Sequence, residues 1–224
     1  MRDAHDPGAA AAGLRRAQPP TSTARGSGST PPGSSFSSPD GMRTTAPGQS
    51  PLLLLDAVPI LEKGSIPYAV IGAMALAFHG VIRASMDVDA LIFLGNRPLE
   101  GLASEFRNAG FTVGVRWGDA QDPIPALMQL SDSFENRVDL LTGLRGLDAG
   151  TVSRTVSCAY EETPLHIVGL EDLIAMKLFA GSFRDIEDIR QLLSVSKERV
   201  DLPLLQQLAL RFGRKERALL DDLL

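Results

Sequence analysis

The chain has 224 residues, of which 44% are hydrophobic, enough for one globular domain or a domain with a small helical appendage. It holds 22 basic and 27 acidic side chains. Residues 1–50 contain five of the basic and three of the acidic ones, so the rest of the chain carries a net charge of −7. That charge disfavours a broad surface for gripping duplex nucleic acid. The single cysteine, Cys158, excludes an internal disulfide, and no apolar run is long enough for a membrane span, so we expect a cytoplasmic protein.

The first part of the chain combines a low-complexity tail with a helix. Residues 1–49 are dominated by Ala, Gly, Pro, Ser and Thr and are expected to be a disordered tail, because such a segment buries too little apolar surface to offset its ordering entropy. Ser50 followed by Pro51 predicts a helix start with a hydroxyl cap. This helix is expected to end at Gly64 and to kink or divide at Pro59.

A strand, a glycine turn, a short helix and a second strand follow in residues 68–93. The turn falls at Gly72, and the second strand carries Asp87 and Asp89. Alternation along a strand places these two carboxylates on one face, about 6–7 Å apart, where they can share a hard divalent cation. The turn brings the N–H groups of a helix start to the same place, where a phosphate would sit. A solvated edge strand is the alternative explanation for the acidic pair.

The rest of the chain alternates short elements and then becomes helical. A helix is expected at 99–109, short strands at 111–115, 124–130, 137–141, 152–160 and 165–168, and helices at 170–181, 183–193 and 202–212. This order predicts an α+β or mixed α/β fold. We expect a core at residues 50–169 and a C-terminal helical part at 170–224.

Four further polar positions stand out. Asp139 lies in an otherwise apolar strand and is a candidate third carboxylate, with a capping or loop role as the alternative. Lys177 falls on the apolar stripe of its helix, so its ammonium either snorkels to solvent or reaches into a cleft. Asp185 and Asp188 share a face of the next helix, and one of them is expected to orient Lys177 or Arg184.

The organising stretch resembles a known superfamily. The residues Gly72–Ala73–Met74–Ala75, His79–Gly80, Arg83, Ser85, Asp87 and Asp89 are similar to those of the nucleotidyltransferases that include DNA polymerase beta, and most of all to the AbiEii-type abortive-infection nucleotidyltransferases. The resemblance covers about residues 52–193. Two positions depart from the pattern: Ala73 replaces the second Gly or Ser of a pair, and Ser85 replaces the usual Thr.

The resemblance implies a polymerase-beta-like core with a small mixed sheet and C-terminal helices. It implies that Asp87, Asp89 and Asp139 are catalytic and hold Mg²⁺ or Mn²⁺, which lowers the pKa of an acceptor hydroxyl and binds the triphosphate. It also implies a nucleotide site made by five residues: Gly72, Ala73, Arg83, Ser85 and Lys177. Arg83 has a structural salt bridge as its alternative role, and Ser85 that of a strand-start hydroxyl.

The activity that follows is transfer of a nucleoside monophosphate from a nucleoside triphosphate to a hydroxyl. The acceptor is an RNA end, a protein or a small molecule, and the resemblance adds a role as the toxin of a toxin–antitoxin pair with an antitoxin protein as partner. The alternative is a catalytically silent nucleotide-binding module that acts through a protein partner. Ala73 and the acidic surface favour this alternative, whereas the set of three carboxylates disfavours it.

Overall fold

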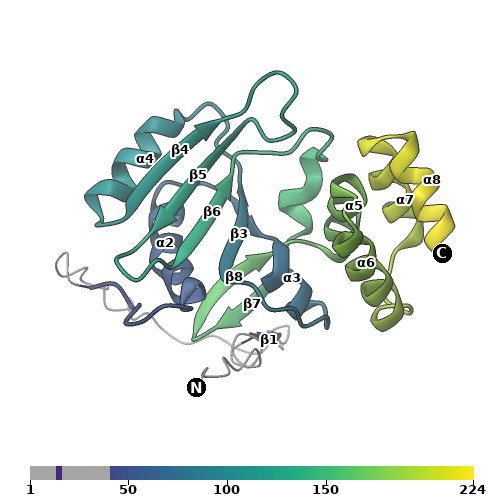
Figure 1. The fold of residues 1–224 in the computed structure, drawn as a ribbon, viewed down its shortest axis with the longest axis horizontal. Helices are drawn as coiled ribbons and strands as arrows, with labels where there is room; N and C mark the ends of the chain where they lie inside the picture. The colour runs from purple at the N-terminus through teal and green to yellow at the C-terminus, as the bar shows by residue number, and fades with distance from the viewer. Residues whose placement is uncertain (1–13, 17–40) are drawn as a thin grey trace, which may run out of the picture.

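The computed structural model describes residues 14–16 and 41–224 (Figure 1). The strands are β1 (Leu14–Arg16), β2 (Tyr68–Val70), β3 (Asp87–Ile92), β4 (Thr112–Trp117), β5 (Ala126–Ser131), β6 (Arg137–Leu141), β7 (Val156–Tyr160) and β8 (Thr163–Ile167). The helices are α2 (Ser50–Lys63), α3 (Gly72–Phe78), α4 (Leu99–Asn108), the 3₁₀ helix η1 (Ala149–Arg154), α5 (Leu170–Ala180), α6 (Phe183–Val195), α7 (Leu202–Phe212) and α8 (Arg214–Leu223). The mixed α/β fold class is therefore confirmed.

All strands form one mixed sheet in the order β1-β7-β8-β2-β3-β6-β5-β4. The strand with the two predicted carboxylates, β3, lies inside this sheet, antiparallel to β2 and parallel to β6. Parallel neighbours need a long crossover, and the chain between β3 and β6 supplies it with α4 and the β4–β5 hairpin. The position of β3 inside the sheet excludes the edge-strand explanation for its acidic pair.

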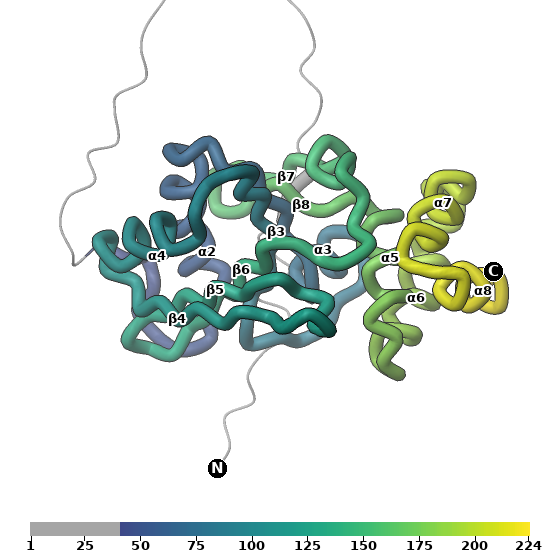
Figure 2. Tube along the Cα trace, turned by 90° about the horizontal axis from the view of Figure 1, so that it is seen from above, coloured from purple at the N-terminus to yellow at the C-terminus, as the bar shows by residue number. Residues whose placement is uncertain are grey.

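Helices α2 and α4 lie on the same side of β4, β5 and β6, and α5–α8 gather at the end of the molecule away from α4 (Figure 2). In β5 the residues Ala126, Met128 and Leu130 are buried in the core to which α2 and α4 also contribute. Leu127, Gln129 and Ser131 alternate with them and are only half-buried. The sheet therefore has a covered face and a second face that remains available to polar side chains.

The start of α2 differs from the prediction. Gln49 is the N-cap residue, and Ser50 is the first helical residue, so the predicted hydroxyl cap is wrong. The Ser50 hydroxyl instead donates to the carbonyl of Met86 at 2.6 Å and accepts from the backbone N–H of Arg137 at 3.0 Å. Ser50 thereby joins the helix to the beginnings of β3 and β6. The helix was expected to kink or divide at Pro59, but Pro59 lies inside one uninterrupted helix.

The described parts of the expected tail are ordered. Residues 1–13 and 17–40 lie outside the described residues, but β1 pairs antiparallel with β7. In the segment before α2, the backbone N–H of Arg43 donates to Asp56 at 2.8 Å and that of Gln49 donates to Asn136 at 2.6 Å. These contacts join the described residues just before α2 to the fold, and the boundary at 49/50 stays a prediction. The division at 169/170 stays a prediction.

The C-terminal helices follow local end signals. Helix α5 stops at Gly181, which adopts the left-handed conformation at φ +63°, and α6 begins with a capping box made by Ser182 and Asp185. Gly213 separates α7 from a further helix, α8, which was not expected from the sequence. In the part of the chain that the structure describes, no helix is both long and apolar enough to cross a membrane.

Candidate active site

The strand register places the predicted carboxylates in one row across the sheet. Asp89 on β3 pairs with Asp139 on β6, and Asp139 pairs with Gln129 on β5. Directly paired residues project from the same face, and Asp87 joins them because it stands two residues before Asp89. Val88, between the two acids, is buried on the opposite face. Asp87, Asp89 and Asp139 therefore share the available face of the sheet, as the sequence predicted.

The turn between β2 and α3 lies directly against this row. Gly72 has φ +64°, a conformation that favours glycine, and a Cβ added there would collide with Oδ2 of Asp89. The backbone N–H of Ile71 donates to the carbonyl of Asp89 at 2.9 Å and holds the turn at this position. A side chain at position 72 would therefore displace the Asp89 carboxylate.

The carboxylates influence one another electrostatically. The pKa of Asp89 is raised to about 6, first by burial and then by the negative charges of Asp139 and Asp87, against the opposing effect of Arg83 and Lys177. An acid that is destabilised as an anion by its acidic neighbours marks a local excess of negative charge. Such an excess is typical of a site that accepts a cation.

The two predicted cations meet at Asp188. Arg83 Nη1 lies 3.0 Å and Lys177 Nζ lies 2.7 Å from the same oxygen, Oδ2 of Asp188. Lys177 is 7% exposed and also pairs with Asp185 at 3.0 Å, so it does not snorkel to solvent. Asp185 and Asp188 of α6 both pair with Lys177, which confirms the expectation that an acid of this helix orients the lysine. Arg184, the other cation considered, is exposed. Arg83 forms the structural salt bridge that was its alternative role.

The side-chain arrangement suits a bound metal ion only in part. Within residues 14–16 and 41–224, no three carboxylate, imidazole or thiolate groups are arranged closely enough to hold one. Two of the acids have other partners: Asp139 Oδ1 accepts from Gln129 Nε2 at 2.9 Å, and Asp87 Oδ2 lies 3.8 Å from Arg137 Nη1. The donor chemistry nevertheless fits a hard divalent cation, because three carboxylates share one face of the sheet. Their role as metal ligands stays a prediction.

A hollow opens beside Asp87. Three of the five residues predicted to bind nucleotide, Ala73, Arg83 and Ser85, line it together with Asp87, whereas Gly72 and Lys177 do not. The Ser85 hydroxyl donates to the backbone carbonyl of Asp87 at 2.9 Å, which matches its alternative role at the strand start. The remaining lining is mainly apolar: Ser50, Pro51, Met74, Ala77, Ile82, Met86 and Val88.

Sequence reasoning missed Gln129. It stands between the buried residues Met128 and Leu130, so the period-two pattern of the strand places it on the opposite face. That alternation was available as a signal, but the contact with Asp139 depends on the register between β5 and β6, which the sequence does not show.

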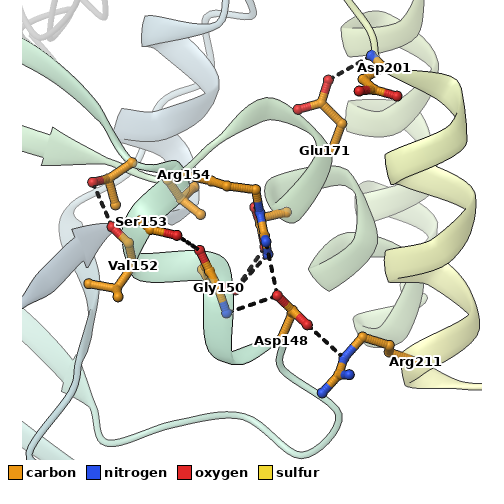
Figure 3. Close-up of polar contacts among 12 residues, drawn as sticks. Asp148, Gly150, Val152, Ser153, Arg154, Glu171, Asp201 and Arg211 are labelled. Atoms are coloured by element: carbon orange, nitrogen blue, oxygen red, sulfur yellow. Dashed lines mark hydrogen bonds and ion pairs between the residues drawn. The ribbon is translucent and has the colours of Figure 1, made fainter.

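A second charged cluster joins η1, α5 and α7 (Figure 3). Arg154 binds buried Asp172 through two hydrogen bonds, at 2.7 and 2.8 Å, and pairs with Asp148 at 2.9 Å. Asp148 also pairs with Arg211 at 3.2 Å, and Thr151 donates to Asp172 at 2.8 Å. The hydrogen bond from Arg154 is the main cause that lowers the pKa of Asp148. This cluster, hereafter the Arg154 cluster, connects the end of the sheet region to the C-terminal helices.

Comparison with known proteins gives the family. Residues 59–215 match the family described as "Nucleotidyltransferase of unknown function (DUF6036)". No curated protein sequence matches significantly. The solution structure of the antibiotic-resistance factor ANT(2″)-Ia is similar, with a TM-score of 0.52 and 15% identity over 78% of this chain and 95% of that one. The crystal structure of ANT(2″)-Ia in complex with adenylyl-2″-tobramycin has a TM-score of 0.51 and 15% identity, over 74% and 99% of the two chains.

At 15% identity these two structures show a shared fold. The family match shows more than a shared fold, because it spans most of the chain and includes every residue predicted for the site. It confirms the nucleotidyltransferase superfamily, while the AbiEii-type likeness stays a prediction. This chain therefore belongs to that nucleotidyltransferase family of unknown function and is a nucleotidyltransferase enzyme.

Proposed function

We propose that this enzyme moves a nucleoside monophosphate from a nucleoside triphosphate to an acceptor hydroxyl, with release of pyrophosphate, at the carboxylate row of β3 and β6. The observation that carries the proposal is the row of Asp87, Asp89 and Asp139 on one face of the sheet, with the Gly72 turn directly against Asp89. Asp87 belongs both to this row and to the hollow that Ala73, Arg83 and Ser85 line, whereas Asp89 and Asp139 do not line the hollow.

In this proposal the three carboxylates hold Mg²⁺ or Mn²⁺. A bound divalent ion supplies charge neutralisation at the triphosphate and lowers the pKa of the acceptor hydroxyl. Asp139, on β6 and so one strand further from the Gly72 turn than Asp89, accepts the hydroxyl proton. Gly72 allows the backbone to come close to phosphate oxygens, and Ala73 follows it in the first turn of α3.

Arg83 and Lys177 offset the negative charge of the triphosphate. Both already act on Asp89, whose pKa they lower, so their charges reach the site even while Asp188 holds them. Catalysis of this kind depends mainly on positioning and electrostatic stabilisation. The shared pairing to Asp188 supplies positioning, because it restricts both flexible cations before the nucleotide arrives.

The net charge of −7 outside residues 1–50 favours a small or cationic acceptor over long nucleic acid. ANT(2″)-Ia, whose crystal structure contains adenylyl-2″-tobramycin, suggests aminoglycosides as the first small molecules to test. RNA ends and protein hydroxyls are the other acceptor classes.

A transfer assay with Mg²⁺ or Mn²⁺ tests the proposal, using each nucleoside triphosphate labelled at the α- and then at the γ-phosphate. The acceptors are aminoglycosides, total RNA and the protein itself. The inactive variant is Asp87→Ala/Asp89→Ala, and Asp221→Ala/Asp222→Ala on α8 is the control with the same loss of charge. Transfer of α-label only, abolished in the first variant and retained in the second, is expected. Transfer of γ-label, or nucleotide binding without transfer, would reject nucleotidyl transfer, and the second result would favour the silent binding module.

The AbiEii-type likeness adds a toxin role with an antitoxin partner to this proposal. Expression of the chain is then expected to arrest growth, and Asp87→Ala/Asp89→Ala is expected to relieve the arrest. Normal growth with a protein that is active in the transfer assay would count against the toxin role.

A further inference from the structure

We propose that Gln129 is a positioning residue for Asp139: its side-chain amide fixes the carboxylate that receives the acceptor proton, so that one oxygen is held and the other is left for the reaction. This inference rests on the function proposed above. It concerns a side chain on β5 that no motif of the family resemblance includes.

The geometry of the contact is set by the sheet. Gln129 and Asp139 are paired residues of the antiparallel strands β5 and β6, and Gln129 Nε2 donates to Asp139 Oδ1 at 2.9 Å. Buried neighbours Met128 and Leu130 anchor β5 on both sides of Gln129. The donor therefore projects from a rigid strand rather than from a loop, which is the arrangement that holds a carboxylate in one orientation.

The chemistry of the amide suits this task. An ionised carboxylate only accepts hydrogen bonds, so the NH₂ group of Gln129 must face Asp139 and its carbonyl must face away. An arginine or lysine at position 129 would pair with Asp139 and compete with a bound cation, and an acid would repel it. A neutral amide orients the carboxylate without cancelling its charge, and Asp139 accordingly still raises the pKa of Asp89.

A purely structural role for Gln129 is less consistent with its surroundings. Gln129 is half-buried, on the face opposite the core residues of β5. Its partner on the other side of the row is Gly114 of β4, where an added Cβ would meet nothing within 4 Å. Open space thus lies beside Gln129 on the available face, so the side chain is not there to fill a packed interior.

Two variants separate the roles of shape and hydrogen bonding. Gln129→Leu keeps much of the volume and removes the donor, and Gln129→Glu keeps the shape but places an acceptor against Asp139. Ser131→Ala, on the same strand and face, and Gln207→Glu, exposed on α7, are the controls. Turnover, KM for the nucleotide and thermal unfolding are measured for each, together with affinity for Mn²⁺ alone by electron paramagnetic resonance.

For Gln129→Leu we expect kcat to fall by about 10- to 100-fold and Mn²⁺ affinity to weaken by a similar factor, as for other groups that orient a ligand carboxylate. Gln129→Glu is expected to lose at least as much turnover, while KM for the nucleotide and the unfolding temperature of both variants stay close to wild type. The two controls are expected to behave as wild type throughout.

Unchanged turnover and Mn²⁺ affinity in Gln129→Leu would overturn the inference. So would a loss of turnover that merely follows a loss of folded protein. The two proposals can be told apart if the wild-type protein transfers no nucleotide. In that case a loss of Mn²⁺ affinity in Gln129→Leu, but not in Ser131→Ala, would support the positioning role and reject the proposed function.

Discussion

The Arg154 cluster and the carboxylate row are both built from aspartates, but their charges are arranged in opposite ways. In the Arg154 cluster two arginines face two aspartates, Asp148 and Asp172, and each aspartate has an arginine within 3.0 Å. In the row three aspartates share a face, and burial and repulsion raise the pKa of Asp89 to about 6. In a balanced cluster the removal of one partner strands a buried charge, whereas an unbalanced row has uncompensated charge that is available for a ligand.

The largest expected effect is in Asp89→Asn, which removes one charge from the unbalanced row without changing its shape. Transfer activity should fall by about 10³-fold or more, a loss of ~4 kcal/mol of transition-state stabilisation. The same variant should be at least as stable as wild type at pH 7, because it removes a buried anion that its neighbours repel. The transfer assay and urea unfolding without metal check both outcomes, with exposed Asp222→Asn as control. A clear loss of stability in Asp89→Asn would contradict the comparison.

The balanced cluster should respond in the opposite way. Arg154→Met leaves Asp172, which is only 3% exposed, without its bidentate partner, and the free energy of unfolding should fall by about 3 kcal/mol. Turnover per folded molecule should be unchanged. The double variant Arg154→Met/Asp172→Leu removes the stranded charge and should recover part of the loss in urea unfolding. Lower turnover with full stability would place Arg154 in the site instead.

The pH dependence of stability should distinguish the row from the cluster. The pKa of Asp89 is raised from 3.8 to about 6, so the folded protein binds this proton more tightly than the unfolded chain does. Its stabilising contribution is present below pH 4 and is lost as the pH rises through 6. Asp89→Asn and wild type should therefore be equally stable near pH 4, and wild type should be less stable by on the order of 2–3 kcal/mol above pH 7. A difference that stays constant between pH 4 and 8 in EDTA would refute this.

The smallest effect on activity is expected at Asp188. Its single carboxylate holds two cations, so it resembles neither the Arg154 cluster nor the carboxylate row. In Asp188→Asn the Lys177 ammonium keeps Asp185, but Arg83 loses its ionic partner. KM for the nucleotide should rise by about 10-fold, which corresponds to ~1.4 kcal/mol. Glu187→Gln on the same helix, whose partner Arg190 is exposed, is the control and should change neither KM nor stability. Tighter nucleotide binding in Asp188→Asn would mean that Asp188 restrains the cations instead of positioning them.

Much of the fold was predictable because its signals are local. Gly72 and Gly181 mark turns that need a left-handed backbone, and β6 and α7 follow from their hydrophobic patterns. The shared face of Asp87 and Asp89 follows from the two-residue period of a strand. These features depend on neighbours only a few residues away.

The rest depends on contacts between distant segments. Ser50 precedes Pro51 and fits a helix cap locally, yet its partners Met86 and Arg137 are 36 and 87 residues away. Arg83 and Lys177 were expected to reach phosphate, and only the packing of α6 reveals that both meet Asp188. Helix α8 was missed because Gly213 is both an end signal for α7 and the residue before α8.

The shared carboxylate of Asp188 has a consequence for the order in which the enzyme matures during synthesis. Arg83 is made early, together with Asp87 and Asp89, but its ionic partner is 105 residues further along the chain. A nascent chain that has reached β6 already contains all three acids of the row, but not Lys177 or Asp188. The three acids and Arg83 are thus translated first, and the pairing of Arg83 and Lys177 with Asp188 can form only after α6 has been made.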